Sequence, residues 1–324
     1  MRSLLLLLAF FTTFNLCGQV GSDLIASLSQ MIVPYQTANS LDGMVNSPVP
    51  EVRPYITPDG QTLYFGRRNH PDNSSGLKDP QDIWTSTLSP QGVWSEPKRM
   101  DGRLNDKWAN AVVNISLDGK TGIFYNTNKK LNVALVKSTY TKTGWSEPSP
   151  IYIEDYSNRH QYADFYAAIE HNVLLLAIER EEGLGEQDLY VSHLNRDGSY
   201  SAPVNLGNTI NTSNSDFAPF LSVDGNTLFF ISSNREGGFG AGDIYMSERL
   251  DNTWQSWTTP VNMGKSVNSV AHECFFSISS DFRFIYIDSA KPGDKDRNIK
   301  LVAFPEFLKS NKFQASIYLP KVSG

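Results

Sequence analysis

The sequence predicts an all-β protein, a five-bladed β-propeller with four antiparallel strands in each blade. Three observations support this. No long stretch shows helical periodicity. Aromatic residues, which favour strands, make up 12% of the chain. Four short signals recur in a fixed order along the 324 residues, three of them five times and one of them four times. A six-bladed ring is the less favoured alternative, because few residues remain after Phe304 to form another blade.

The first signal is an apolar strand that runs into a turn and a second strand. Its copies are "PEVRPYITPDGQTLYF" at 50–65, "NAVVNISLDGKTGIFY" at 110–125, "DFYAAIEHNVLLLAI" at 164–178, "DFAPFLSVDGNTLFFI" at 216–231 and "ECFFSISSDFRFIYI" at 273–287. Asp-Gly between two apolar stretches is a strong hairpin signal. We therefore expect each copy to form the inner strand and the second strand of one blade.

The second signal opens the third strand of each unit. Asp82, Asp188 and Asp243 lead clear copies, and Asn132 and Asn298 lead decayed ones, at steps of 50, 56, 55 and 55 residues. The loop before this residue is rich in glycine, as in "NREGGFGAGD" at 234–243. It leads into a strand and not into a helix, which disfavours a phosphate-binding loop. We expect the glycines to supply positive φ angles and the aspartates to hold the loops.

The third signal is an aromatic residue followed by a proline, and the fourth is an asparagine before the next inner strand. The third reads "WSEP" at 94–97 and 145–148, "YSAP" at 200–203 and "WTTP" at 257–260. The asparagines are Asn46, Asn105, Asn158, Asn211 and Asn268. We expect an outer strand that ends at each proline, with the tryptophans packed between blades. One blade cannot bury both faces alone, so neighbouring blades must stack.

The first residues read as a targeting segment. "MRSLLLLLAFFTTFNLCGQ" has one arginine, an apolar run and small residues near Cys17 and Gly18, which predicts a signal peptide over 1–18. A lipoprotein anchor at Cys17 is disfavoured because Leu16 precedes it. We therefore expect an exported protein, in the periplasm or at the cell surface, with no integral membrane segment in the mature chain.

Residues 19–45 form an N-terminal segment before a propeller over 46–320. A closing strand would come from "SQMIVPY" at 29–35 or from "KFQASIYLP" at 312–320, and the sequence does not decide between them. Without residues 1–18 the chain has 27 basic and 34 acidic residues, a net charge of −7. An acidic exported protein is a poor candidate for binding nucleic acid. Cys274 would be the only cysteine, in an apolar context typical of a buried thiol.

These motifs together resemble bacterial TolB-like β-propellers with WD-like repeats, over roughly residues 40–308. The resemblance is carried by "ITPDGQTLYFGRRNHP", "QDIW", "WSEP", "LGNTINTSNSDFAPF" and "GAGDIYMSERLDNTWQSWTTPVNMG". Envelope proteins of this kind often continue into an OmpA-like domain, which we do not expect here. The resemblance implies a non-catalytic scaffold with a protein or glycan partner in the cell envelope, and it supplies no catalytic residues.

One aligned column holds the strongest candidates for a site. It contains Glu51, Asn110, Asp164, Asp216 and Glu273, at the start of the five inner strands. We expect these residues to ring one mouth of the channel, where repulsion would need a cation, a basic ligand or backbone donors. The structural alternative is that each acid accepts hydrogen bonds from nearby backbone. Calcium or magnesium would suit oxygen ligands, although no compact calcium-binding loop is present.

Other residues join this ligand-binding prediction. His272 adjoins Glu273, and Arg53 lies two residues after Glu51. The long polar loop "RRNHPDNSSGLKDPQD" at 67–82 adds Arg67, Arg68 and His70 as loop candidates, because long irregular loops on a regular scaffold often bind partners.

Two enzyme classes were weighed against the scaffold. Sialidases need a cluster of arginines, but the column two residues after the acids reads Arg53, Val112, Tyr166, Ala218 and Phe275, with one arginine. A five-bladed glycoside hydrolase with carboxylates at the channel mouth is the better alternative, since an inverting pair needs about 6.5–9.5 Å between its groups. Acids that obey the repeat favour architecture over catalysis, so we predict no catalytic residues.

Overall fold

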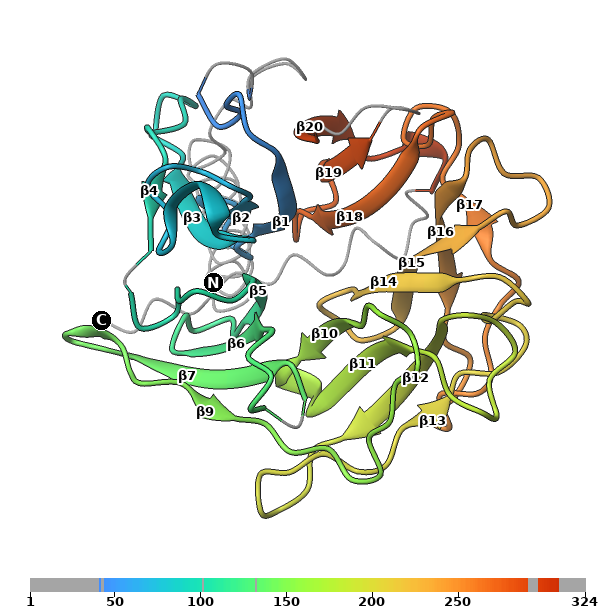
Figure 1. The fold of residues 1–324 in the computed structure, drawn as a ribbon. Helices are drawn as coiled ribbons and strands as arrows, with labels where there is room; N and C mark the ends of the chain where they lie inside the picture. The colour runs from blue at the N-terminus through green and yellow to red at the C-terminus, as the bar shows by residue number, and fades with distance from the viewer. Residues whose placement is uncertain (1–40, 42–43, 101, 132, 291–296, 309–324) are drawn as a thin grey trace, which may run out of the picture.

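Short antiparallel sheets surround a common centre in the computed structural model (Figure 1). The structure describes residues 41, 44–100, 102–131, 133–290 and 297–308. The predicted signal peptide at 1–18 and the two predicted closing strands at 29–35 and 312–320 lie outside the described residues. Among those that are described, helix is limited to three short 3₁₀ turns, η1 (Gly76–Lys78), η2 (Ile169–His171) and η3 (Glu306–Leu308).

The first three repeats form one sheet each. The first sheet contains β1 (Glu51–Ile56), β2 (Thr62–Arg67), β3 (Asp82–Thr87) and β4 (Lys98–Arg99). The second contains β5 (Asn110–Ile115), β6 (Thr121–Asn126) and β7 (Leu135–Thr141), which pairs with both β8 (Gly144–Trp145) and β9 (Ser149–Pro150). The third contains β10 (Asp164–Ala168), β11 (Val173–Ile178), β12 (Asp188–His193) and β13 (Val204–Asn205).

The last two repeats share one seven-stranded sheet. Its first part is β14 (Asp216–Leu221), β15 (Thr227–Ser233), β16 (Gly242–Glu248) and β17 (Val261–Asn262). Its second part is β18 (His272–Ile278), β19 (Phe284–Ala290) and β20 (Asn298–Ala303). The two parts meet through one parallel pair, Gly242 with His272. The first strands of the repeats, β1, β5, β10, β14 and β18, face the centre (Figure 1), so the arrangement is that of a β-propeller.

The predicted hairpin turns follow from residues that tolerate positive φ. Every turn between an inner strand and its second strand has one such residue, and their φ angles lie between 52° and 74°. They are Gly60, Gly119, Asn172, Gly225 and Phe282. The Asp-Gly prediction is therefore confirmed in three repeats, whereas Asn172 and Phe282 take the same conformation in the two repeats that lack glycine.

The outer strands differ from the prediction. Each is only two residues long and follows the proline instead of ending at it, since β4, β9, β13 and β17 all start at the first position after the aromatic-proline motif. Proline has no N–H group to donate to the sheet, so it precedes the paired residues. The aromatic residue of the motif is buried, as Trp94, Trp145 and Trp257 show. Trp94 packs edge-on against Tyr286 of β19, with ring centroids 6.3 Å apart, which joins the first repeat to the last.

The repeated asparagines tie neighbouring repeats together. The Oδ1 of Asn105 accepts a hydrogen bond from Ile83 N at 2.7 Å, and its Nδ2 donates to Ile83 O at 3.0 Å. Asn211 makes the same two bonds with Leu189, and Asn268 makes them with Ile244. Each of these three asparagines therefore clips the third strand of the preceding repeat and replaces lost backbone pairing. Asn158 differs, because it bonds within its own repeat, to His160 O, Tyr162 O and Glu179 N.

The same clip joins the two ends of the described chain. Asn46, before β1, accepts a hydrogen bond from Ile299 N and donates one to Ile299 O, both at 3.0 Å. Glu51 N also donates to Arg297 O at 2.8 Å. The first and last repeats therefore contact each other as sequential neighbours do.

Candidate functional site

The predicted acidic column lies at the expected end of the inner strands, but its side chains are buried. Each of the five residues stands at or next to the start of its strand and is at most 4% exposed: Glu51, Asn110, Asp164, Asp216 and Glu273. Four of them accept a hydrogen bond from the residue four positions earlier, donated by Ser47, Asp106, Thr212 and Ser269. These four side chains hold the entry loops of their own repeats, as the structural alternative expects.

Burial changes the acidity of this column. It raises the pKa of Glu273 to about 7, although the Ser269 hydroxyl donates a hydrogen bond to Oε1 at 2.6 Å. It raises the pKa of Asp216 to about 6, against the donors of Thr212. The second carboxylate oxygens of Glu273 and Asp216 are buried without a hydrogen-bond partner in the described structure. These carboxyl groups are therefore hard to ionise.

Asp164 is the exception in the column. Its Oδ1 lies 2.8 Å from Arg53 Nη2, so an ion pair links β10 to β1 across the centre. The strand β10 also lacks the register shift that interrupts the other four inner strands. The guanidinium of Arg53 lies over the rings of Phe275, at 3.8 Å, and Tyr125, at 4.9 Å. The ion pair and the two rings hold this arginine in the channel.

A pocket occupies the channel beside this ion pair. Residues from all five inner strands line it, with Arg53 and Asp164 at one end and Tyr55, Tyr166 and Phe220 at the other. The column that lies two residues after the acids faces this space in every repeat: Arg53, Val112, Tyr166, Ala218 and Phe275. Asp164 is the only carboxylate among the lining residues.

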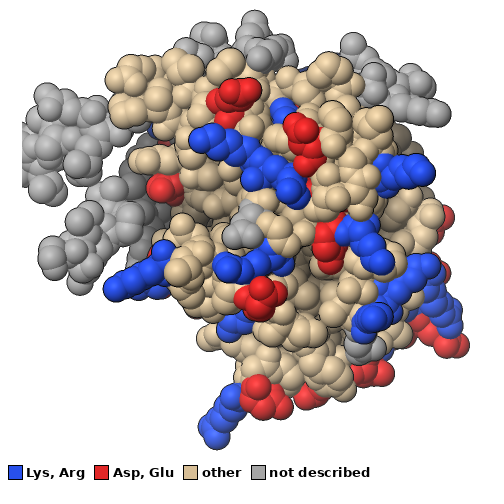
Figure 2. Space-filling model, turned by 60° about the vertical axis from the view of Figure 1, so that its left-hand side comes forward, with Lys and Arg blue, Asp and Glu red and all other residues tan. Residues whose placement is uncertain are grey.

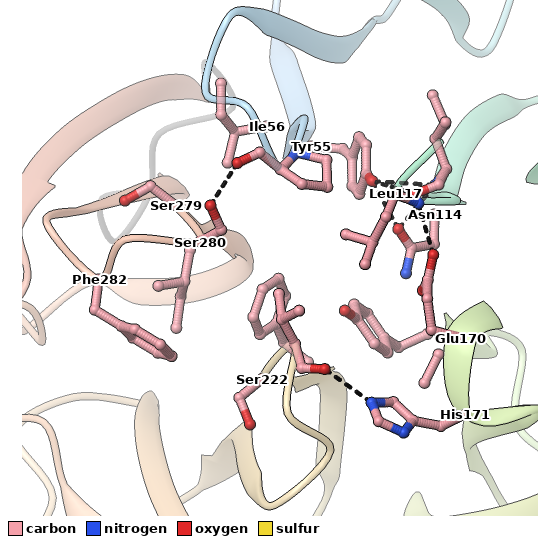
Figure 3. A pocket seen from close by; sticks show the side chains of 17 residues that line it. Tyr55, Ile56, Asn114, Leu117, Glu170, His171, Ser222, Ser279, Ser280 and Phe282 are labelled. Atoms are coloured by element: carbon pink, nitrogen blue, oxygen red, sulfur yellow. Dashed lines mark hydrogen bonds between the residues drawn. The ribbon is translucent and has the colours of Figure 1, made fainter. Parts of the chain in front are cut away.

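A second pocket opens at the opposite end of the inner strands, and sequence reasoning did not find it. It has about 580 Å³ of empty space, part of which is open to solvent. The rings of Tyr55, Tyr166, Phe220 and Phe282 contribute to its wall, and the first three also line the channel pocket. Figure 3 shows labelled residues from several repeats pointing toward this space. We call it the turn-side pocket, because the hairpin turns surround it.

Polar groups at the rim of the turn-side pocket bond to neighbouring turns. Glu170 Oε1 accepts a hydrogen bond from Leu117 N at 2.6 Å, and His171 Nε2 lies 2.8 Å from Val223 O (Figure 3). Glu170 is the only carboxylate that lines the pocket. One sequence signal was available: "AIEHN" at 168–172 replaces the Asp-Gly turn in the third repeat.

The loop candidates have separate environments. Arg67 ends β2 and is buried, with its Nε 3.1 Å from Glu51 Oε1 and its guanidinium 4.6 Å from the Trp84 ring centroid. His70 packs edge-on against Trp84 at 4.6 Å, and burial lowers its pKa. Arg68 is partly buried. The structure therefore gives Arg67 and His70 packing contacts within the first repeat.

His272 begins β18 and packs beside Phe217, with ring centroids 5.9 Å apart. Burial lowers its pKa, and the charge of Arg297 lowers it further. Cys274 is a free thiol that is partly buried, not fully buried as predicted, and burial raises its pKa to about 11, which disfavours the reactive thiolate.

Asp288 is a central residue that the sequence did not single out. It is fully buried in β19, and its two oxygens accept hydrogen bonds from Arg53 N at 2.7 Å and Phe275 N at 3.1 Å. Arg297 Nη2 lies 3.6 Å from Asp288 Oδ1. Burial raises the pKa of Asp288, and the arginine charges oppose this shift. In the sequence, the only indication of a role for Asp288 was an acid inside the apolar strand "FIYIDSA".

The sequence column predicted a single arginine at this end of the channel, and the structure adds two more. Arg297 enters from the fifth repeat, and Arg68 comes from the end of the first hairpin. Both belong to other alignment columns, so comparison of one column could not find them. The interpretation that no arginine cluster exists was wrong for this reason.

The described residues give no support for a metal centre. They contain no group of three or more His, Cys, Asp or Glu side chains placed to hold a metal ion. The calcium prediction remains untested. The described part of the chain also contains no helix that is long and apolar enough to cross a membrane.

Comparison with known proteins gives fold-level likenesses only. No family model matches the chain, and no curated protein matches it in sequence. Among solved structures, TolB from Acinetobacter baumannii is similar at 13% identity and a TM-score of 0.44, over 80% of this chain and 56% of TolB. The chain therefore spans about half the length of that protein.

Two further solved structures are enzymes. An α-L-arabinofuranosidase from Lactobacillus brevis is similar at 15% identity and a TM-score of 0.46, over 82% of this chain and 94% of the enzyme. An endo-arabinase from Bacteroides thetaiotaomicron is similar at 16% identity and a TM-score of 0.46, over 79% and 94%. Likenesses of this size do not distinguish a scaffold from a hydrolase.

Proposed function

We propose that this protein is an exported, non-catalytic β-propeller that binds a glycan or protein partner in the cell envelope through its channel openings. The observation that carries the proposal is the number of carboxylates that line the two pockets. Among the residues that the structure describes, one carboxylate lines each of the two pockets. Both carboxylates already accept a hydrogen bond, Asp164 from Arg53 and Glu170 from Leu117 N. Glycoside hydrolysis by the usual route needs a pair.

The turn-side pocket is the better binding site of the two. Aromatic rings form much of its wall, and a few polar groups stand at its rim, which is the usual composition of a ligand site. A sugar ring or an apolar side chain would fit against such rings. The pocket draws residues from all five repeats, so its shape depends on the whole ring.

A closed ring of five blades is part of this proposal. Its support is the Asn46 clip, which repeats at the junction of the first and last repeats the bonds that Asn105, Asn211 and Asn268 make at three others. Export is also proposed, on the apolar segment at 1–18.

The test uses the purified chain from residue 19 on a glycan array and in pull-downs from the cell envelope. Ser280→Phe places a ring in the turn-side pocket, and Ser149→Phe places one on the exposed outer strand β9 as a matched control. We expect Ser280→Phe to weaken binding at least about tenfold, while Ser149→Phe leaves it unchanged. The proposal would be refuted if Ser280→Phe left binding unchanged, or if neither assay detected binding.

The alternative is a five-bladed glycoside hydrolase. It is favoured by the raised pKa values of Glu273, to about 7, and Asp216, to about 6, because a general acid needs such a shift. The assay is release of sugar from a panel of polysaccharides and nitrophenyl glycosides. Turnover that disappears in a folded Glu273→Gln or Asp216→Asn variant would establish the hydrolase and exclude the scaffold.

A further inference from the structure

Arg68 is a charged group whose guanidinium has no direct partner among the described residues. It follows the last residue of β2 and is partly buried. Its backbone N–H donates to Pro50 O at 3.1 Å. Its guanidinium makes no hydrogen bond or ion pair with any described residue. A guanidinium carries five donors, and those of Arg68 are free to bond a ligand.

Two other arginines lie beside Arg68. Residues on either side of the start of β1 position them: Arg68 N bonds to Pro50 O on one side, and Arg297 O accepts from Glu51 N on the other. The guanidinium groups of Arg53 and Arg297 both lie within 6.0 Å of the Phe275 ring centroid. Burial lowers the pKa of Arg68, and the charges of Arg297 and Arg53 lower it further, while the charge of Asp288 opposes this shift. The three cations therefore repel one another.

Among the described residues, the nearby acids leave one arginine without a direct partner. Asp164 pairs with Arg53 at 2.8 Å, and Asp288 lies 3.6 Å from Arg297. Arg67, the next residue along the chain, is paired with Glu51. In the part of the chain that the structure describes, three arginines thus face two carboxylates, and Arg68 is the one that neither carboxylate contacts directly. Acidic and basic side chains are interspersed on the face of the molecule shown in Figure 2, without one broad basic patch.

We propose that Arg68, together with Arg297 and Arg53, binds an oxyanion of a ligand at the end of the channel where the inner strands begin. The group would be a carboxylate, a phosphate or a sulfate, because a guanidinium fork matches two oxygens of each. This site lies at the opposite end of the channel from the turn-side pocket, so it goes beyond the proposed function. An ordered anion there would offset the repulsion among the three arginines.

The experiment is calorimetric titration of the full mature chain with sodium phosphate, sodium sulfate and sodium galacturonate, at constant ionic strength. Arg68→Gln removes the charge and the fork, and Arg68→Lys keeps the charge alone. Arg196→Gln is the matched control, because Arg196 is exposed and its substitution removes the same charge at another place on the surface. The three anions separate a phosphate, sulfate or carboxylate preference.

We expect saturable binding of at least one anion and a loss of at least about tenfold in affinity for Arg68→Gln. Arg68→Lys should fall between the wild type and Arg68→Gln, and Arg196→Gln should match the wild type. Without anion, Arg68→Gln should melt at a higher temperature than the wild type, since it relieves repulsion. The proposal fails if no anion binds saturably, if Arg68→Gln and Arg196→Gln bind alike, or if Arg68→Gln melts lower without anion.

Discussion

Arg53 Nη2 lies 2.8 Å from Asp164 Oδ1, and this ion pair connects β1 to β10 across the channel. Both side chains are largely buried, at 17% and 5% exposure. Desolvation makes such a pair a weak net contributor, but removal of one partner leaves a buried charge unpaired. The pair therefore joins two repeats that are not neighbours in sequence.

Asp164→Asn should consequently destabilise the protein strongly. We expect the free energy of unfolding to fall by about 3–5 kcal/mol, because Arg53 keeps its charge without its partner. Urea denaturation followed by tryptophan fluorescence measures this change. Glu147→Gln is the control, since Glu147 is 84% exposed and its contact with Arg103 is 3.5 Å long. Equal, small losses in both variants would show that the Arg53 pair has no structural role.

Asp164→Asn should have a second effect if the oxyanion site is correct. The variant leaves three arginines facing Asp288 as the remaining acid of the cluster, so the surplus charge rises from one to two. We expect the affinity for the preferred anion to increase several-fold over the wild type in the same calorimetric titration. An unchanged or lower affinity in a variant that is still folded would count against a role for Arg53 in the site.

The Asn46 clip predicts how the ring closes. Asn46→Ala removes both bonds to Ile299 and leaves the buried N–H and C=O of Ile299 without these partners. We expect a loss of about 2 kcal/mol. Asn268→Ala, which breaks the same clip to Ile244, should cost a similar amount. Urea unfolding of both variants makes the comparison. A large loss in Asn268→Ala beside none in Asn46→Ala would mean that the first and last repeats do not close in this way.

Much of the fold was predictable because its devices are local and repeated. Asp188 and Asp243 accept hydrogen bonds from the loops before them, as the repeated Asp position predicted. The turns at Gly60, Gly119 and Gly225 likewise needed only their own sequence. Such contacts recur in several copies, and comparison of the copies shows them.

The candidate site was less predictable because its contacts cross between repeats. The Arg53–Asp164 pair joins two alignment columns, and Arg68 and Arg297 come from two others. The buried column of acids was placed at the right end of the channel, but its side chains hold their own entry loops. Which side chains meet at the centre depends on the arrangement of the whole ring, and comparison of the repeats alone does not predict these contacts.

The glycine loops serve two purposes, and substitution can separate them. Gly237 has φ 81°, with nothing near an added Cβ, which agrees with the predicted positive φ. Gly240 instead allows close approach, since an added Cβ would lie 2.3 Å from Ser269 O. We expect Gly237→Ala to cost about 1 kcal/mol through strain and Gly240→Ala about 1–3 kcal/mol or more through overlap with backbone. Gly102→Ala, with open space around it, should cost little in the same thermal unfolding assay.

The buried acids give the protein an unusual dependence on pH. The folded pKa of Glu273 is raised from 4.5 to about 7, and that of Asp216 from 3.8 to about 6. At pH values between the unfolded and the folded pKa of each group, the folded state binds more protons than the unfolded state. The contribution of both groups to stability therefore falls as pH rises. It is fully present below about pH 4 and is lost by about pH 7 to 8.

Glu273→Gln should remove the larger part of this dependence. Glutamine has the same shape, can still accept from the Ser269 hydroxyl and never ionises, so it avoids the cost of a buried charge at high pH. We expect its free energy of unfolding, relative to the wild type, to increase by on the order of 3 kcal/mol between pH 5 and pH 8. Urea titrations at both pH values measure the difference. Glu236→Gln, on an exposed loop, should differ from the wild type in free energy of unfolding by the same amount at both pH values. If the Glu273→Gln difference were also constant with pH, the Glu273 carboxyl would have to titrate alike in the folded and unfolded chains.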